Sequence, residues 1–190
     1  MTLDRGMTAL TRCLRAVPAA VALLVALAWP VSAADAPRSP EYLIKAAYLY
    51  NFAMFVEWPA DAFASADAPL VIGIVGPDPF GTAIDHAVAN KRISKRRIVV
   101  ERVQPQQDLR RCQILFIAAS ERGRIGELSQ RLQSQPILIV DDAPEPGRRA
   151  GAVEFVVDDN KVGFAINLAT ARRARLVISS KMLGLAKTVR

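Results

Sequence analysis

Residues 113–118, Gln-Ile-Leu-Phe-Ile-Ala, form an almost uninterrupted apolar run in the middle of the chain, and this run decides the fold class. A strand without polar alternation is typical of a parallel sheet whose two faces are both covered. Three other segments that predict strands lie around it, at 70–75, 97–103 and 136–140. Helical patterns at about 80–89 and 125–133 separate these runs. The alternation predicts an α/β fold, in which a mostly parallel, Rossmann-like sheet carries helices on both faces.

The last third of the chain follows a different pattern. Residues 152–157 and 162–166 are apolar runs joined by Asp-Asp-Asn-Lys at 158–161, a connection typical of a β-hairpin. We therefore expect an antiparallel C-terminal hairpin at the edge of the parallel sheet. Residues 167–190 predict a basic, helical tail with a break at 176–179, where β-branched residues gather. Because no repeat or linker interrupts the sequence from residue 41 onward, we expect one domain.

The sequence EYLIKAAYLYNFAMFVEWP at 41–59 predicts a helix that is apolar on almost all sides. Glu41 and Lys45 are spaced for an i,i+4 ion pair, and the other polar side chains are Asn51 and Glu57. At 3.6 residues per turn these four do not share a face, so the helix is expected to be buried on several sides. Two interpretations stay open: a partner covers its second side, or it is the core helix of a monomer.

Residues 1–33 have the composition of a secretory signal peptide. Three arginines precede an apolar run at 16–29, and a small-residue cleavage site ends at Ala33, although cleavage after Ala34 fits as well. A permanent membrane anchor is the alternative, but the run is short for a membrane span. We expect an exported, periplasmic protein whose first residues, 34–40, are a flexible leader.

Export limits the partners that this basic chain meets. Its formal net charge is +7, and basic residues cluster at 91–97 and 172–175 without interleaved aromatic residues. These clusters predict solvated faces and no nucleic-acid binding. Cys112 is the only cysteine outside the expected signal peptide, which excludes an internal disulfide. Its apolar neighbours predict a small core residue, and an intermolecular disulfide stays open.

A loop with two glycines, GPDPFG at 76–81, follows one predicted strand and opens a helix. Anions often bind the free backbone N–H groups at such a place, and Asp141 ends another predicted strand at the same edge of the sheet. We therefore expect a small-molecule or anion pocket formed by Gly76, Asp78, Gly81 and Asp141. Helix capping by Asp78 and turn formation are the structural alternative.

Catalytic groups are missing from the pattern. His86 is the sole histidine, and no nucleophile accompanies it at a spacing that suggests catalysis. Asp141 and Asp142 lack a histidine or cysteine at metal-ligand spacing. We predict a protein that is not an enzyme and that has no metal site or cofactor.

Three separated blocks of sequence carry a resemblance to a known family. They are residues 42–59, residues 72–80 with Gly76, Asp78 and Phe80, and residues 163–186 with GFAIN at their start and SSKML near their end. The run at 112–117 also suits the family's third strand. Together these blocks resemble the YfiR family of periplasmic regulators, in order and over essentially all of 41–190.

The resemblance implies a repressor that binds the periplasmic sensor region of an inner-membrane diguanylate cyclase and lowers cyclic di-GMP, which controls biofilm formation and motility. It also implies a homodimer and an outer-membrane lipoprotein that sequesters the repressor. The expected contacts are four aromatic residues of the first helix, Tyr48, Phe52, Phe55 and Trp58, which fill the core in the alternative interpretation. A periplasmic small-molecule or anion-binding protein is the alternative function, and an uncharacterised hydrolase is a third.

Overall fold

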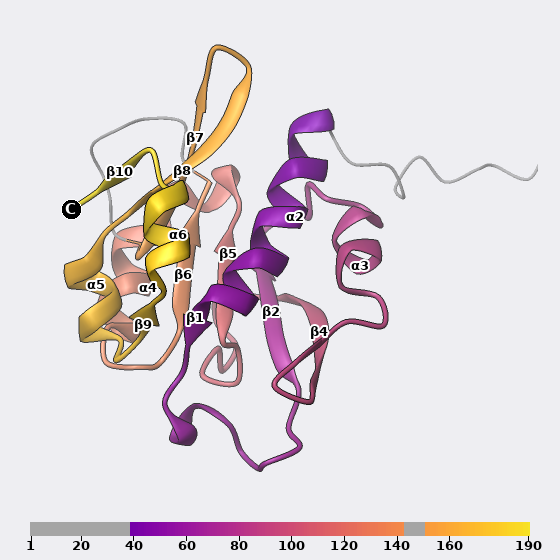
Figure 1. Ribbon diagram of the computed structural model, residues 1–190, viewed down its shortest axis with the longest axis vertical. Helices are drawn as coiled ribbons and strands as arrows, with labels where there is room; N and C mark the ends of the chain where they lie inside the picture. The colour runs from indigo at the N-terminus through magenta and orange to yellow at the C-terminus, as the bar shows by residue number, and fades with distance from the viewer. Residues whose placement is uncertain (1–38, 143–150) are drawn as a thin grey trace, which may run out of the picture. The chain divides into compact units, whose positions relative to one another are not determined.

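An eight-stranded, mostly parallel sheet forms the centre of the fold (Figure 1). The computed structural model describes residues 39–142 and 151–190, all within one compact unit, Asp35–Arg190. The expected signal peptide and most of the expected leader lie outside the described residues. In spatial order the strands are β10 (Thr188–Val189), β8 (Lys161–Ile166), β7 (Val153–Asp158), β6 (Leu138–Asp141), β5 (Ile114–Ile117), β2 (Leu70–Val75), β4 (Arg96–Val103) and β3 (Arg92–Ile93).

Strand β5 shows why an uninterrupted apolar run folds this way. It pairs in parallel with β2 on one side and with β6 on the other. Its successive side chains point to opposite faces of the sheet, so Ile114 and Phe116 enter one apolar core while Leu115 and Ile117 enter the other. All four are fully buried, as the sequence predicted for a strand covered on both faces.

Helices cover the two faces unequally. Four helices pack into the larger core: α2 (Pro40–Phe55), α3 (Ala83–Val88), α5 (Leu168–Arg173) and α6 (Ser180–Leu185). The opposite face is covered by α4 (Ile125–Leu132), whose Ile125, Leu128 and Leu132 point into the smaller core. Two 3-10 helices, η3 (Ala60–Ala62) and η4 (Ala119–Arg124), complete the described part. The α/β fold with helices on both faces is confirmed.

The first helix is shorter than the sequence predicted. It ends at Phe55, and β1 (Val56–Glu57) pairs antiparallel with β9 (Val177–Ile178). Val56 is extended, with φ −109° and ψ 137°, and its β-branched side chain is buried. Pro59 also disfavours helical backbone at the residue before it. The predicted helix end at residue 59 is therefore wrong, because this segment contributes a strand to a second, two-stranded sheet.

The predicted C-terminal hairpin is confirmed. β7 and β8 pair antiparallel, with Asp158 opposite Lys161. Between them Asp159 and Asn160 have φ values of +48° and +59°, the left-handed pair that a two-residue hairpin turn requires. The hairpin is not the edge of the sheet, however, because β10 pairs in parallel with β8. The tail also differs from the predicted broken helix, since it contains the short helices α5 and α6 and the strands β9 and β10.

Candidate functional site

The strand order creates a topological switch point at β2. The chain passes from β2 to β4 on one side and then to β5 on the other. In open α/β sheets, ligands bind where the carboxyl ends of such strands diverge. Here that position is packed: a Cβ atom built on Gly76 would lie 2.8 Å from Cγ of Glu121 and 3.3 Å from Cβ of Ala118. Gly76 also has φ +93°, so its lack of a side chain serves a close approach of η4.

Asp78 and Gly81, the other two predicted ligand residues of this loop, are held by internal interactions. Asp78 Oδ1 accepts a hydrogen bond from the Phe80 backbone N–H at 2.7 Å, which forms an Asx turn and not the predicted helix cap, because α3 begins at Ala83 with Thr82 at its N-cap position. Its Oδ2 accepts from Arg102 Nε at 2.8 Å, and Arg102 also donates to the Gly81 carbonyl. Its hydrogen bonds to Asp85, and to a smaller extent to Asp78, raise the pKa of Arg102. The loop is therefore tied to β4, and its binding of a ligand stays a prediction.

A buried charge cluster lies where β6 ends. Lys45 Nζ is 2.5 Å from Oδ1 of Asp142, and the Tyr42 hydroxyl donates to Oδ2 at 2.9 Å. Lys45 also forms the predicted i,i+4 ion pair with Glu41. Lys45 is 4% exposed and Asp142 is 5% exposed. Burial raises the pKa of the Asp142 carboxyl, and Lys45 and Tyr42 oppose that rise. The cluster fastens the first half of α2 to the carboxyl end of β6.

A cavity of about 530 Å³ opens beside this cluster. It lies between the amino-terminal half of α2, the end of β6 and the β7–β8 hairpin. Its described lining is Glu41, Tyr42, Lys45, Ala119, Asp142, Glu154, Phe155, Val156, Val157, Asp158, Ala165, Lys187, Thr188 and Arg190. Charged groups of both signs and an apolar wall suit a polar organic molecule. Asp142 lines this cavity, whereas Gly76, Asp78, Gly81 and Asp141 are not among its described lining residues.

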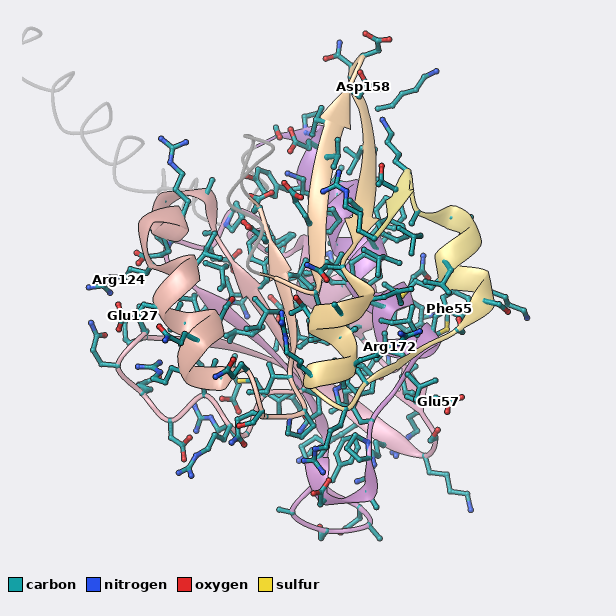
Figure 2. The ribbon with its side chains drawn as sticks, turned by 90° about the vertical axis from the view of Figure 1, so that its left-hand side faces the viewer. Phe55, Glu57, Arg124, Glu127, Asp158 and Arg172 are labelled. Carbon is teal, nitrogen blue, oxygen red and sulfur yellow. The ribbon has the colours of Figure 1, made fainter. Side chains whose placement is uncertain are left out.

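The predicted partner contacts divide into a core residue and three partly exposed ones. Phe52 is 1% exposed, and its ring centroid lies 5.0 Å from that of Phe164. It therefore offers a partner no surface in the folded protein. Tyr48, Phe55 and Trp58 are half-buried, with Phe55 visible at the end of α2 (Figure 2). Trp58 Nε1 donates to the Gln113 carbonyl at 3.2 Å, so part of its side chain serves the fold.

The outer face of α2 is apolar, and the sequence alone did not single out its residues. Leu43 is 53% exposed, Ile44 47% and Met54 42%, and Ala47 between them is also exposed. Residues 43, 47 and 54 repeat at helical spacing, so they lie along one side of the helix, which we call the α2 stripe together with Ile44. The four carry no charge. Their periodicity was visible in the sequence, but nothing there distinguished the exposed side of an all-apolar helix from its buried side.

Other reactive groups in the described part of the chain show no catalytic arrangement. His86 is exposed on α3. Cys112 is a free thiol in the smaller core, as predicted, and burial raises its pKa to about 11. Among residues 39–142 and 151–190, no cluster of three or more His, Cys, Asp or Glu side chains is placed to hold a metal ion.

These features define a class of protein: an α/β domain with an exposed apolar helix face and a buried charge cluster. The chain belongs to the YfiR/HmsC-like family, whose model matches residues 42–187. It is a family of periplasmic regulatory proteins, associated with the control of diguanylate cyclases. No match was found among curated proteins. Within the described residues, no helix combines the length and the apolarity needed to cross a membrane.

Proposed function

We propose that this protein is exported to the periplasm and represses an inner-membrane diguanylate cyclase by binding its periplasmic sensor region with the α2 stripe. The observation that carries the proposal is the exposure of four uncharged side chains, Leu43, Ile44, Ala47 and Met54, on one helix. A helix that buries one apolar face and leaves the other exposed is typical of a surface that a partner covers. Tyr48 and Phe55, which are half-buried beside the stripe, complete the proposed contact.

Repression requires the protein to bind one state of the cyclase better than the other. A shift from 1:99 to 99:1 needs a difference of roughly 5.5 kcal/mol in binding free energy. Full burial of a Leu, Ile or Met side chain contributes about 1.5–3 kcal/mol. Because the large side chains of the stripe are already about half-buried, each has roughly 1 kcal/mol left to contribute. When the stripe contacts only the repressed state of the cyclase, it supplies a substantial part of this difference, and the flanking aromatic residues supply more.

The proposal includes a homodimer and an outer-membrane lipoprotein that competes for the repressor. Both are what the resemblance to the YfiR family implies. It also includes removal of residues 1–33, which leaves a chain that begins near Ala34. Mass spectrometry of the protein from the periplasm tests this cleavage directly, since retention of residues 1–33 would contradict it.

Binding of the purified cyclase sensor region to stripe variants tests the proposed surface. We expect Ile44→Glu and Met54→Glu each to weaken binding at least tenfold, because a buried, unpaired carboxylate costs more than the roughly 1.4 kcal/mol that a tenfold change represents. Val189→Glu is the matched control, since Val189 is 40% exposed but lies on strand β10. Unchanged binding by both stripe variants contradicts the proposed surface. If they instead change only the oligomeric state, the stripe serves a second copy of this chain.

The cavity beside Asp142 favours a second candidate function, binding of a small periplasmic molecule. Its volume of about 530 Å³ lies within the range of roughly 300–1,000 Å³ that is usual for ligand pockets. A ligand that binds the native state raises its apparent stability. Thermal-shift screening with anions and metabolites tests this candidate, and the absence of any reproducible shift would remove it.

A further inference from the structure

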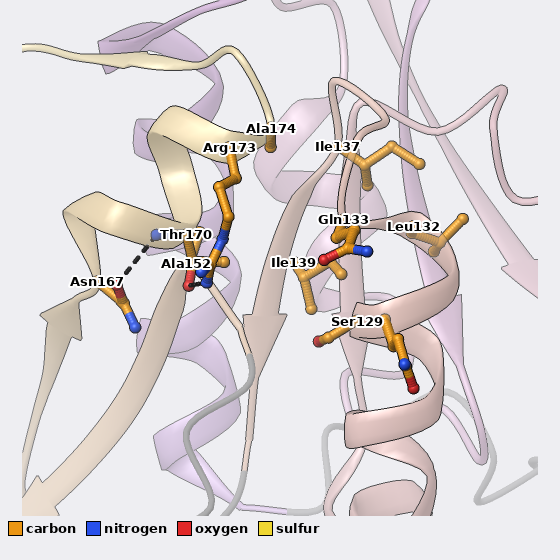
Figure 3. Close-up of a pocket in the computed structure, with 11 residues that line it drawn as sticks. Ser129, Leu132, Gln133, Ile137, Ile139, Ala152, Asn167, Thr170, Arg173 and Ala174 are labelled. Carbon is orange, nitrogen blue, oxygen red and sulfur yellow. Dashed lines mark hydrogen bonds between the residues drawn. The ribbon is translucent and has the colours of Figure 1, made fainter.

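A second cavity, of about 250 Å³, lies between α4 and α5 (Figure 3). It is at the end of the sheet where β6 and β7 begin, opposite the end that carries Asp142. Its apolar lining comes from Leu132, Ile137, Ile139, Ala152 and Ala174, and its polar lining from Ser129, Gln130, Gln133, Asn167, Thr170 and Arg173. The cavity thus has an apolar floor, and α4 and α5 form two walls that carry polar side chains.

Ser129 on the α4 wall is unusual. Its hydroxyl oxygen is buried and has no hydrogen-bond partner among the described residues. A buried polar group without a partner costs about 1–3 kcal/mol. The oxygen is closed off from the groove in this rotamer, so it becomes a binding group only when the side chain turns toward a ligand with an acceptor oxygen.

Arg173 on the facing α5 wall is the only charged side chain in the described lining. It donates one hydrogen bond to Thr170 Oγ1, at 3.0 Å. Within residues 39–142 and 151–190 it forms no ion pair, whereas Arg175, two residues later, pairs with Asp61 at 2.8 Å. A guanidinium has five N–H donors in a planar fork that matches a carboxylate. Most of these donors therefore remain available to an anion.

We propose that this groove binds a small organic anion, with a carboxylate head at Arg173 and a short apolar body over Ile137, Ile139 and Ala152. The hydroxyl of Ser129, once turned into the groove, donates a further hydrogen bond to the bound molecule. The volume is below the range of roughly 300–1,000 Å³ for drug-sized ligands, which limits the ligand to a small molecule. The site is separate from the α2 stripe, so it does not depend on the proposed binding of a cyclase.

Titration with hexanoate, followed by NMR or calorimetry, tests the proposal on the purified protein. We expect saturable binding with chemical-shift changes at residues of α4 and α5, and binding of 1-hexanol at least tenfold weaker because it lacks the carboxylate. Arg173→Gln is expected to weaken hexanoate binding at least tenfold. Arg172→Gln is the matched control: Arg172 is the exposed neighbour on α5, outside the lining, and should change affinity less than twofold (Figure 2).

Three results overturn the proposal. They are no saturable binding of hexanoate, equal binding of hexanoate and 1-hexanol, or equal weakening by the two arginine variants. The comparison of hexanoate with hexanol uses the unchanged protein, so it decides the question even if a variant folds poorly. Circular dichroism of both variants confirms that any loss of binding is not a loss of structure.

Discussion

Replacement of Lys45 by methionine should strongly destabilise the protein. Methionine has a similar length and volume but no charge, so the change removes the ammonium group and little else. Asp142 then keeps its buried position and its hydrogen bond from Tyr42, but loses the cation at 2.5 Å. Glu41 also loses its partner, although it is about one-third exposed and can turn toward water.

The expected magnitude follows from the burial of the pair. The side chains of Lys45 and Asp142 are 4% and 1% exposed. Removal of one member of a buried ion pair typically costs about 3–5 kcal/mol, because the other charge is left without compensation. Domains of this size are stable by only about 5–15 kcal/mol, so Lys45→Met should remove a large part of the free energy of unfolding.

Urea unfolding followed by tryptophan fluorescence measures this free energy. Trp58 is the only tryptophan outside residues 1–33, and its half-buried indole reports on the junction of α2 with the sheet. Arg175→Met is the matched control, since Arg175 and Asp61 form an exposed pair whose side chains are 49% and 62% accessible. An exposed pair contributes about 0–1 kcal/mol. A loss below 1 kcal/mol for Lys45→Met, with an unchanged dependence on urea concentration, would refute the reasoning.

The effect of Lys45→Met should also depend on pH. Burial raises the folded-state pKa of Asp142 above the ordinary value of 3.8, and Lys45 opposes this rise. A carboxyl group whose pKa is higher in the folded than in the unfolded state stabilises the folded protein fully at a pH below its unfolded-state pKa. This contribution is lost as the pH rises through the folded-state pKa. Without Lys45 the folded pKa of Asp142 rises further. The deficit of the variant should therefore be largest at neutral pH and shrink as the pH falls, because protonation of Asp142 removes the uncompensated charge; a deficit independent of pH contradicts this origin.

Two further predictions concern single residues of the sheet and its loops. Gly76→Ala should destabilise the folded protein by about 1–3 kcal/mol, because an alanine at φ +93° is strained and its Cβ atom meets Glu121. Gly126→Ala on α4 should instead stabilise it by up to about 1 kcal/mol, because the added Cβ atom meets nothing within 4 Å. Thermal melts compare the two variants, and equal changes in melting temperature contradict the different roles given to the two glycines. The Cys112 thiol, with its pKa raised to about 11 by burial, should react with Ellman's reagent only when the protein unfolds. Rapid reaction of the native protein, or a disulfide-linked dimer on a non-reducing gel, contradicts this expectation.

The central strands could be predicted from the sequence because burial on both faces leaves a local signature. The apolar runs of β2 and β5 need no knowledge of their neighbours to be recognised. The Asp159-Asn160 turn is equally local, since both residues tolerate positive φ. The two-residue strands had no such signature. Val56 becomes a strand residue because Ile178 lies beside it, and that pairing joins positions more than a hundred residues apart.

The candidate sites depended still more on tertiary structure. The sequence showed that Lys45 could pair with Glu41 on the same helix, but not that Asp142 would complete a buried cluster. It placed Phe52 among the partner contacts, whereas packing against Phe155 and Phe164 makes it a core residue. The groove with Ser129 and Arg173 is lined by residues of α4, α5 and the neighbouring strands that lie far apart in the chain, so no sequence spacing could have indicated it.

Cellular cyclic di-GMP tests the proposed repression most directly. It is measured in the parent strain, in a strain that lacks this gene, and in that strain complemented with the wild-type protein or with Met54→Glu. We predict that cyclic di-GMP rises when the gene is removed, returns to the parental level with the wild-type protein, and stays high with a folded Met54→Glu protein. An unchanged level in the strain without the gene, while a cyclase is expressed, would contradict repression itself. Full complementation by Met54→Glu would contradict the role of the α2 stripe.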